Sequence, residues 1–246
     1  MPAPGAALTE AECLTPPWEA HDTPQRAAMA GLLDGLWPVL ARQPSLEAAV
    51  QSLAPTFCLV SPLRELEGYL DAETLHIVLR ADAPATLQTA ILLHELRHLD
   101  QLARGFCPST TLTMRENARQ AFALEADASA ISLLIAWDMR HHGNPGPWEA
   151  LAAWPQQSDI AARFAAVMED GGDPAEAAAA AFAQWYARPG RLESYSLASC
   201  SDYLDRLDTA HLLPGQSVRQ PDFLERLCRL PDDTAYPCVE AGDRRR

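Results

Sequence analysis

The chain has 246 residues and a formal net charge of -14, from 33 acidic residues against 19 basic ones. Every basic residue is arginine, and lysine is absent. Nucleic acid and anionic membranes are not expected as partners, because an acidic surface repels polyanions. The hydrophobic fraction of 48% is ordinary for a globular protein, so a chain that is disordered throughout is not expected.

The cysteines and the first 25 residues indicate in which cellular compartment the protein is expected. The six cysteines show no CxxC spacing, which argues against a structural zinc site built on cysteine. The first 25 residues hold no apolar run as long as a secretory signal, and the purest apolar stretch, Ile131–Trp137, is too short to span a bilayer. We therefore expect a cytoplasmic protein with reduced thiols, and a Cys228–Cys238 pair stays open.

The first 80 residues are predicted to pass from loop to helix to strand. Residues 1–22 are rich in Pro, Ala and Glu without periodicity, and we expect a loose leader. A helix is predicted after Thr23 as N-cap, and a shorter one over Ser45–Ala54. Runs of β-branched and apolar residues at 56–61 and 74–80 predict two strands, and the stretch between them has room for a third short strand and a turn.

Helical patterns dominate after residue 80. One helix is predicted to start with Asp82 as a possible cap and to stop at Gly105. A long one is predicted from Thr113, with Glu116 in capping-box register, to Arg140.

The remaining residues are predicted to form helices joined by loops. One of these helices has Asp173 as cap, Glu176 three residues later and Gly190 as stop. The fold class predicted is α+β, mainly helical with a small β-sheet. The predicted organisation is a leader over 1–22, a core over 23–144 and a helical C-terminal region over 145–246 that packs on the core.

The most specific motif lies in the helix that is predicted to end at Gly105. Residues 94–98 read HELRH, which matches the pattern H-E-x-x-H. A spacing of four residues puts His94 and His98 on one helix face, close enough to share one zinc ion. Glu95 lies about 100° around the helix, where a carboxylate can take a proton from a zinc-bound water. Zinc lowers the pKa of that water and polarises a substrate carbonyl.

A chance pair of core histidines is the plainer interpretation of these residues. Leu87, Ile91 and Leu102 share roughly the face of the two histidines, so the imidazoles are expected to point inward. Unpaired polar groups are costly there, and a metal ion would satisfy them. The pattern therefore favours a zinc-dependent peptidase with Glu95 as general base.

A catalytic zinc ion usually has three protein ligands and one open position. The metzincin pattern needs a glycine and a histidine where this chain has Gln101 and Arg104, so that class is excluded. The candidate third ligand is Glu125, on a helix face whose small residues allow close approach. Asp127 lies on a different face and is a candidate to accept a hydrogen bond from the far nitrogen of a ligand histidine. Which of the two acids is the third ligand stays open.

Two further residues, Tyr195 and Arg97, have less specific predicted roles. Tyr195 is a candidate donor to the oxyanion of a tetrahedral intermediate, and an ordinary half-buried aromatic residue is the alternative. Arg97 occupies a variable position of the motif, where it is expected to face solvent or to pair with an acid.

The order of strand, HELRH helix and helix with EADA resembles the gluzincin metallopeptidases. Within them it looks most like small uncharacterised bacterial metallopeptidases with HELRH and EADA signatures, over roughly residues 55–140. The resemblance implies a zincin-like core in which the strand before the HExxH helix, here Thr74–Arg80, is an edge that pairs with extended peptide. The chain departs from larger gluzincins, which often have E-x-x-x-D on the second helix, because Ser129 stands four residues after Glu125.

Two other classes of function compete with the zinc peptidase. The first is a catalytically silent zincin-like module for binding or regulation, with the region after residue 144 as a lid, a partner surface or a dimer interface. The second is a helical structural protein without metal. Glu95 favours the enzyme, because a module that only holds metal does not need it. The expected substrate is a peptide or protein, and the oligomeric state stays open.

Overall fold

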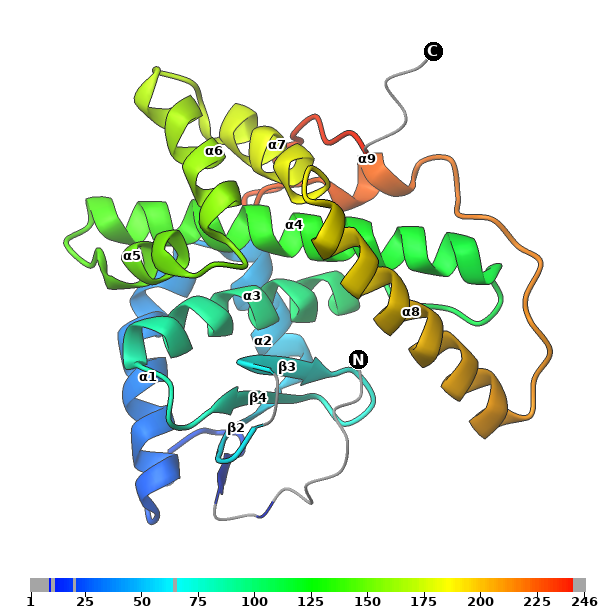
Figure 1. Ribbon diagram of the computed structural model, residues 1–246. Coiled ribbons are helices and arrows are strands. Elements are labelled where there is room, and N and C mark those ends of the chain that lie inside the picture. The colour runs from blue at the N-terminus through cyan, green and yellow to red at the C-terminus, as the bar shows by residue number, and fades with distance from the viewer. Residues whose placement is uncertain (1–8, 10–11, 20, 64–65, 241–246) are drawn as a thin grey trace.

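The computed structural model describes residues 9, 12–19, 21–63 and 66–240. Parts of the predicted leader and the last six residues, 241–246, lie outside this range. The described residues form four strands and nine helices (Figure 1). The strands are β1 (Cys13–Leu14), β2 (Thr56–Val60), β3 (Gly68–Asp71) and β4 (His76–Arg80). The helices are α1 (Pro24–Leu40), α2 (Pro44–Leu53), α3 (Ala85–Ala103), α4 (Met114–His141), α5 (Gly146–Ala153), α6 (Ser158–Glu169), α7 (Pro174–Trp185), α8 (Pro189–Ala210) and α9 (Phe223–Leu227). A mainly helical α+β fold is therefore confirmed.

The sheet has the strand order β1-β2-β4-β3. Strands β2 and β4 are parallel, and β1 and β3 are antiparallel to their neighbours. Strand β4 is paired on both sides, so the expectation that Thr74–Arg80 provides the sheet edge is wrong. The cause is the segment before it, which folds back as a hairpin and places β3 at the edge, with Gly68 opposite Leu79.

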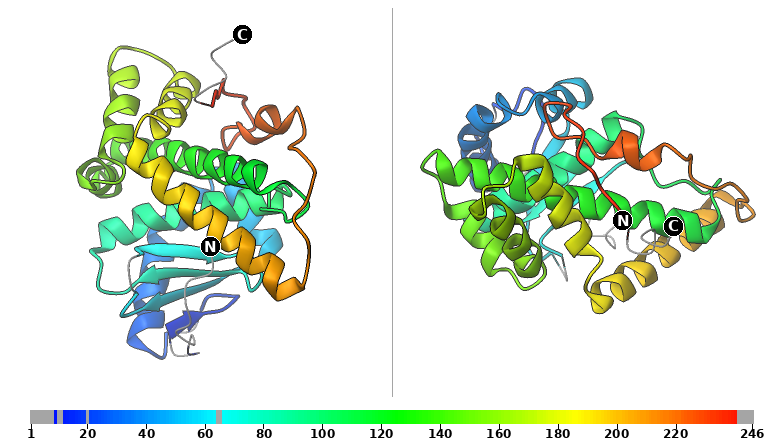
Figure 2. Two further views of the ribbon diagram at one scale, coloured as in Figure 1. Left: turned by 45° about the vertical axis from the view of Figure 1, so that its right-hand side comes forward. Right: turned by 90° about the horizontal axis from the view of Figure 1, so that it is seen from above.

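The helices lie in layers above the sheet. In Figure 1 the sheet lies lowest, α3 runs above it, α4 runs above α3, and α6 and α7 lie above α4. Helix α1 packs on β1 and β2, and α2 packs on α3. Both views in Figure 2 show α8 crossing α4 obliquely, and these two helices are in contact. None of the helices in the described residues has the length and hydrophobicity needed to cross a membrane.

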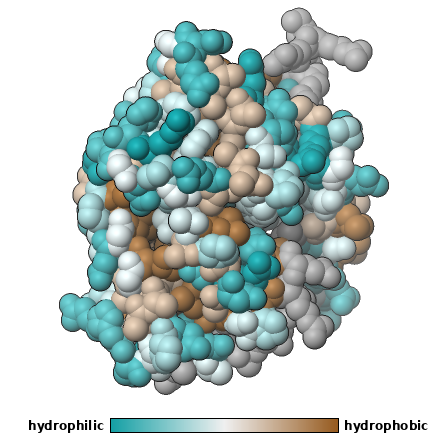
Figure 3. Space-filling model, turned by 60° about the vertical axis from the view of Figure 1, so that its left-hand side comes forward, coloured by the Kyte–Doolittle hydropathy of each residue, from teal (hydrophilic) through white to brown (hydrophobic). Residues whose placement is uncertain are grey.

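The two faces of the sheet have different partners. Alternate residues of a strand point to opposite faces. Phe57 and Ile77 therefore point into the main core with the helices, while Cys58 and Val78 belong to a smaller cluster on the other face. Figure 3 shows one side of the molecule, where hydrophobic side chains reach the surface in a central band and hydrophilic ones cover much of the rest.

Helix starts are predicted better than helix ends. Thr23, Thr113 and Asp173 all act as N-caps, and Asp173 forms the expected capping box with Glu176. Asp82 does not cap α3, whose N-cap is Pro84. Gly105 follows the end of α3 with a φ of +81°, a left-handed conformation that glycine adopts at little cost.

The predicted stop at Gly190 is wrong. Helix α7 ends at Trp185, and Gly190 lies in the first turn of α8. The pattern was ambiguous because Pro189 favours the start of a new helix as much as the end of the old one.

Two disulfides correct the expectation for the thiols. Cys13 of β1 is bonded to Cys58 of β2, and Cys228 is bonded to Cys238. Thus part of the predicted leader is an ordered edge strand, while Cys107 and Cys200 are free. Strand pairing brings Cys13 and Cys58 together across 45 residues, a distance at which the sequence has no pairing signal. Persistent disulfides are more typical of oxidising compartments than of the cytoplasm. The cytoplasmic location stays a prediction.

Candidate metal centre

Helix α3 packs closely against β3, the edge strand of the sheet. A Cβ atom added to Gly68 of β3 would lie 2.6 Å from Cγ2 of Ile91 on α3. The missing side chain therefore lets β3 lie close against α3. Ile91 is one helical turn before His94, so the edge strand runs beside the start of the HExxH motif.

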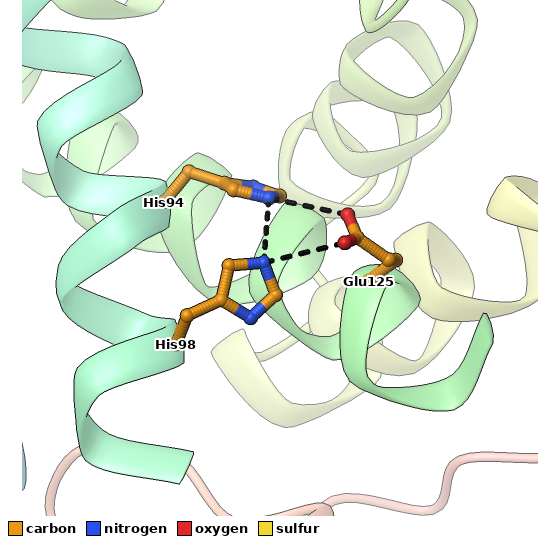
Figure 4. Close-up of side chains that lie close together, drawn as sticks. All are labelled: His94, His98 and Glu125. Carbon is orange, nitrogen blue, oxygen red and sulfur yellow. Dashed lines mark hydrogen bonds and ion pairs between the residues drawn. The ribbon is translucent and has the colours of Figure 1, made fainter. Parts of the chain in front are cut away.

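Three metal-binding side chains converge between α3 and α4 (Figure 4). His94 and His98 point from α3 toward Glu125 on α4, and their Nε2 atoms lie 3.0 Å apart. The carboxylate oxygens of Glu125 lie 3.4 Å from Nε2 of His94 and 3.6 Å from Nε2 of His98. These three residues, called the ligand cluster below, have potential ligand atoms within 4.8 Å of one another. Within the residues that the structure describes, no other such group of His, Cys, Asp and Glu is found.

The residues of the ligand cluster shift one another's pKa values. Burial lowers the pKa of His98, but the neighbouring Glu125 carboxylate outweighs it and raises that pKa to about 9. Burial also raises the pKa of Glu125, but His98 and His94 hold it well below the usual range. Two imidazoles and one carboxylate form a donor set that suits a catalytic zinc ion with one open position. The residues present therefore fit the metal that the motif predicts.

Glu95 lies beside the ligand cluster rather than in it. It is buried, with 6% of its surface exposed. Its charge adds to the effect of Glu125 in raising the pKa of both His98 and Tyr195. The carboxylate is therefore near the cluster without being one of its three converging members.

Tyr195 reaches the cluster from α8. Its ring centroid lies 5.1 Å from that of Trp185. The charge of Glu125, followed by burial, raises the Tyr195 pKa well above its ordinary value of 10. The residue is half-buried, as the plainer alternative expected, yet the Glu125 carboxylate is the largest influence on its pKa.

Asp127 does not contact a ligand histidine, so that prediction is wrong. Its carboxylate is fully buried and accepts hydrogen bonds from Arg97, Gln101 and Tyr236. The partner of His98 is Gln101, whose Oε1 lies 2.8 Å from Nδ1 of the imidazole. Gln101 stands three residues after His98, a spacing at which helical side chains meet, and this signal could have identified it.

Arg97 is completely buried, so of the two predicted outcomes the ion pair is confirmed and solvent exposure is wrong. Its Nε lies 2.7 Å from Asp127, and its Nη1 lies 2.6 Å from Asp100. Burial lowers the Arg97 pKa, but the charge of Asp127 outweighs it and raises the pKa. Arg97, Asp100 and Asp127 are called the buried ion network below. It joins the HELRH helix to the EADA helix.

One cavity lies away from the ligand cluster. It has a volume of about 530 Å³ and lies between α2, the end of α3 and residues 229–233. Asp100 and Arg104 line it, but none of the three residues of the ligand cluster does. The metal centre is therefore identified by its converging ligand atoms and not by this cavity.

Comparison with known protein families places the chain in one of them. Residues 6–238 match the family model described as "Putative metallopeptidase family (DUF6782)". No curated protein and no solved structure matches the chain. The match extends beyond residues 55–140, over which the motifs resemble gluzincins, and includes almost all of the C-terminal region. The chain therefore belongs to this metallopeptidase family.

Proposed function

We propose that the chain is a zinc-dependent peptidase of the gluzincin type. The observation that carries the proposal is the convergence of His94, His98 and Glu125 within 4.8 Å on an HExxH helix and the helix that follows it. Membership of a metallopeptidase family supports hydrolysis of peptide bonds. In this proposal the three residues hold the zinc ion, and Glu95 is the general base.

Each of the chain's residues has a separate task. When bound, zinc supplies a Lewis acid for the scissile carbonyl and lowers the pKa of a water molecule. Glu95 takes the proton of the attacking water and passes it to the leaving amine. Tyr195 keeps its hydroxyl proton because its pKa is raised, so it is able to donate a hydrogen bond to a developing oxyanion.

The substrate we propose is an extended peptide along β3. This strand is the last in the sheet order, so one of its edges has no strand partner among the described residues. Main-chain pairing at such an edge binds peptide without requiring a particular side chain. The close contact of Gly68 with Ile91 puts this edge beside the start of the HExxH motif. The net charge of -14 favours basic peptides over acidic ones.

Zinc analysis together with one substitution tests the proposal. Purified protein should hold about one zinc ion per chain, and His94→Ala should lose it. Glu95→Gln should keep the zinc ion and lose hydrolysis of a peptide library. A wild-type chain without zinc would contradict the metal centre. A zinc-loaded wild type as inactive as Glu95→Gln would contradict the peptidase and support the silent binding module.

A further inference from the structure

Gln101 has only one possible amide orientation. Its Nε2 donates hydrogen bonds to the backbone oxygen of Leu124 at 2.9 Å and to Oδ2 of Asp127 at 2.7 Å. Reversing the amide would place its oxygen against two acceptors, which is unfavourable. The oxygen of Gln101 therefore faces His98, where Oε1 lies 2.8 Å from Nδ1.

This orientation determines the tautomer of His98. An amide oxygen accepts but does not donate, so the proton of the bond lies on Nδ1 of His98. In the neutral imidazole Nε2 then has the free lone pair. Nε2 is also the atom that faces His94 and Glu125. Gln101 thus selects the form of His98 that presents a ligand nitrogen to the cluster.

Asp127 is held so that it acts only as an acceptor. Its Oδ1 accepts from Tyr236 at 2.6 Å and from Nη2 of Arg97 at 3.0 Å. Its Oδ2 accepts from Nε of Arg97 and from Gln101, both at 2.7 Å. With all four bonds made, the carboxylate has little freedom to rotate away from Gln101.

Tyr236 brings the C-terminal segment into this chain of bonds. It is buried and lies between Cys228 and Cys238, which are joined by a disulfide. Arg97 also donates to the backbone oxygen of Arg229 at 2.7 Å in the same segment. These hydrogen bonds hold the C-terminal segment, which is more than 130 residues away in sequence, against the HExxH helix.

We propose that Gln101 is a positioning residue that fixes the metal-binding tautomer of His98, and that Tyr236 stabilises this arrangement through Asp127. The inference rests on the metal centre of the proposed function. It assigns a role in metal binding to Gln101 and to the C-terminal segment, neither of which holds a ligand atom. Groups that orient ligand histidines typically change metal affinity by about 10- to 100-fold when they are removed.

The test compares Gln101→Met with Gln88→Met. Gln88 is a matched control because it is buried on the same helix and its Nε2 donates to the backbone oxygens of Arg80 and Ala81, at 2.9 and 3.1 Å. Zinc affinity is measured by competition with a chromophoric chelator, and the melting temperature is measured in metal-free buffer. We expect Gln101→Met to bind zinc about 10-fold or more weakly, and Gln88→Met to stay within about twofold of wild type.

A second pair of variants, Tyr236→Phe and its control Tyr203→Phe, tests the inference if Gln101→Met does not fold. Tyr236→Phe removes one hydroxyl behind the centre, and Tyr203→Phe removes another buried hydroxyl, bonded to Leu112 at 2.9 Å. We expect zinc binding to weaken about threefold or more for Tyr236→Phe, and not for Tyr203→Phe. The visible spectrum of the Co²⁺-loaded protein should change in the same two variants that lose zinc affinity.

The outcomes separate this inference from the proposed function. Wild-type zinc affinity in folded Gln101→Met would overturn the inference and leave the metal centre standing. An equal loss in Gln88→Met would also overturn it, because the effect would then be structural. A wild-type chain that binds no zinc would overturn both.

Discussion

The two sides of the HExxH helix are built differently. The side chains of the ligand cluster are 15–22% exposed, and the contacts among them span 3.0 to 3.6 Å. The buried ion network is closed to solvent, and its ion-pair contacts range from 2.6 to 3.0 Å. Oxygen and nitrogen atoms that already form short hydrogen bonds and ion pairs are less available to bind a metal ion. Atoms with longer contacts are more available. The comparison indicates that the network supplies rigidity and the cluster keeps its bonding capacity for a ligand.

The largest effect is expected from Glu95, because it is the general base of the proposed reaction. Glu95→Gln should lower kcat by about 100- to 10,000-fold, the usual contribution of a positioned base. The substitution leaves the ligand cluster intact, so the zinc content should stay that of wild type. Steady-state kinetics and metal analysis check this together, and loss of zinc with loss of rate would show that Glu95 acts through the metal instead.

Breaking the buried ion network should mainly affect stability. Arg97→Met leaves Asp127 buried without its cation and leaves Asp100 with Arg104 alone, 3.6 Å away, so we expect a loss of about 3–5 kcal/mol in the free energy of unfolding. The surface pair of Arg42 with Asp138 is the control, and Arg42→Met should cost less than about 1 kcal/mol. Denaturant unfolding measures both. Equal losses would contradict the difference between the buried and the exposed pair.

The zinc affinity of the ligand cluster should depend on pH. His98 has a pKa of about 9 without metal, above its ordinary value of 6.5, and its proton must leave Nε2 before zinc binds. Apparent zinc affinity should therefore rise by up to about tenfold per pH unit as the pH increases toward 9, and then level off. For the metal-free fold the sign is opposite, because the raised pKa stabilises it fully below pH 6.5 and this contribution is lost as the pH rises through 9. Zinc titrations at several pH values test the first statement, and a flat affinity between pH 7 and 9 would contradict it.

A smaller effect is expected from Tyr195 at the edge of the cluster. Tyr195→Phe removes the hydroxyl that is proposed to donate to a developing oxyanion, and we expect kcat to fall by about 10-fold or more while zinc is retained. Tyr186→Phe is the control, because its buried hydroxyl has no hydrogen-bond partner among the described residues. An unchanged kcat for Tyr195→Phe would limit that residue to packing.

The sequence predicts the ligand cluster better than the buried ion network. His94 and His98 follow from a spacing within one helix, and Glu125 follows from the small residues around it, which allow α4 to approach α3. The network has one local pair, Arg97 with Asp100 three residues later, but the other contacts of Arg97 span 30 residues to Asp127 and 132 residues to the backbone of Arg229. No local pattern encodes the long-range contacts, so the sequence leaves open whether Arg97 faces solvent or pairs with an acid.

The strand order was not predicted from the sequence, because it too depends on contacts between residues that are distant in sequence. The apolar run at 74–80 identifies β4 as a strand, but the hairpin that covers its edge depends on how closely β3 packs against α3. That contact requires Gly68 opposite Ile91, a pairing that becomes visible only in three dimensions. The cysteines behave in the same way, because each disulfide depends on the fold rather than on spacing.

The central claim is that two histidines and one glutamate bind a single zinc ion. X-ray absorption at the zinc edge of the loaded protein tests it most directly. The account predicts one zinc ion per chain with nitrogen and oxygen neighbours at about 2.0–2.2 Å, and loss of that signal in His98→Ala. Sulfur neighbours at about 2.3 Å, or an unchanged spectrum in His98→Ala, would contradict it.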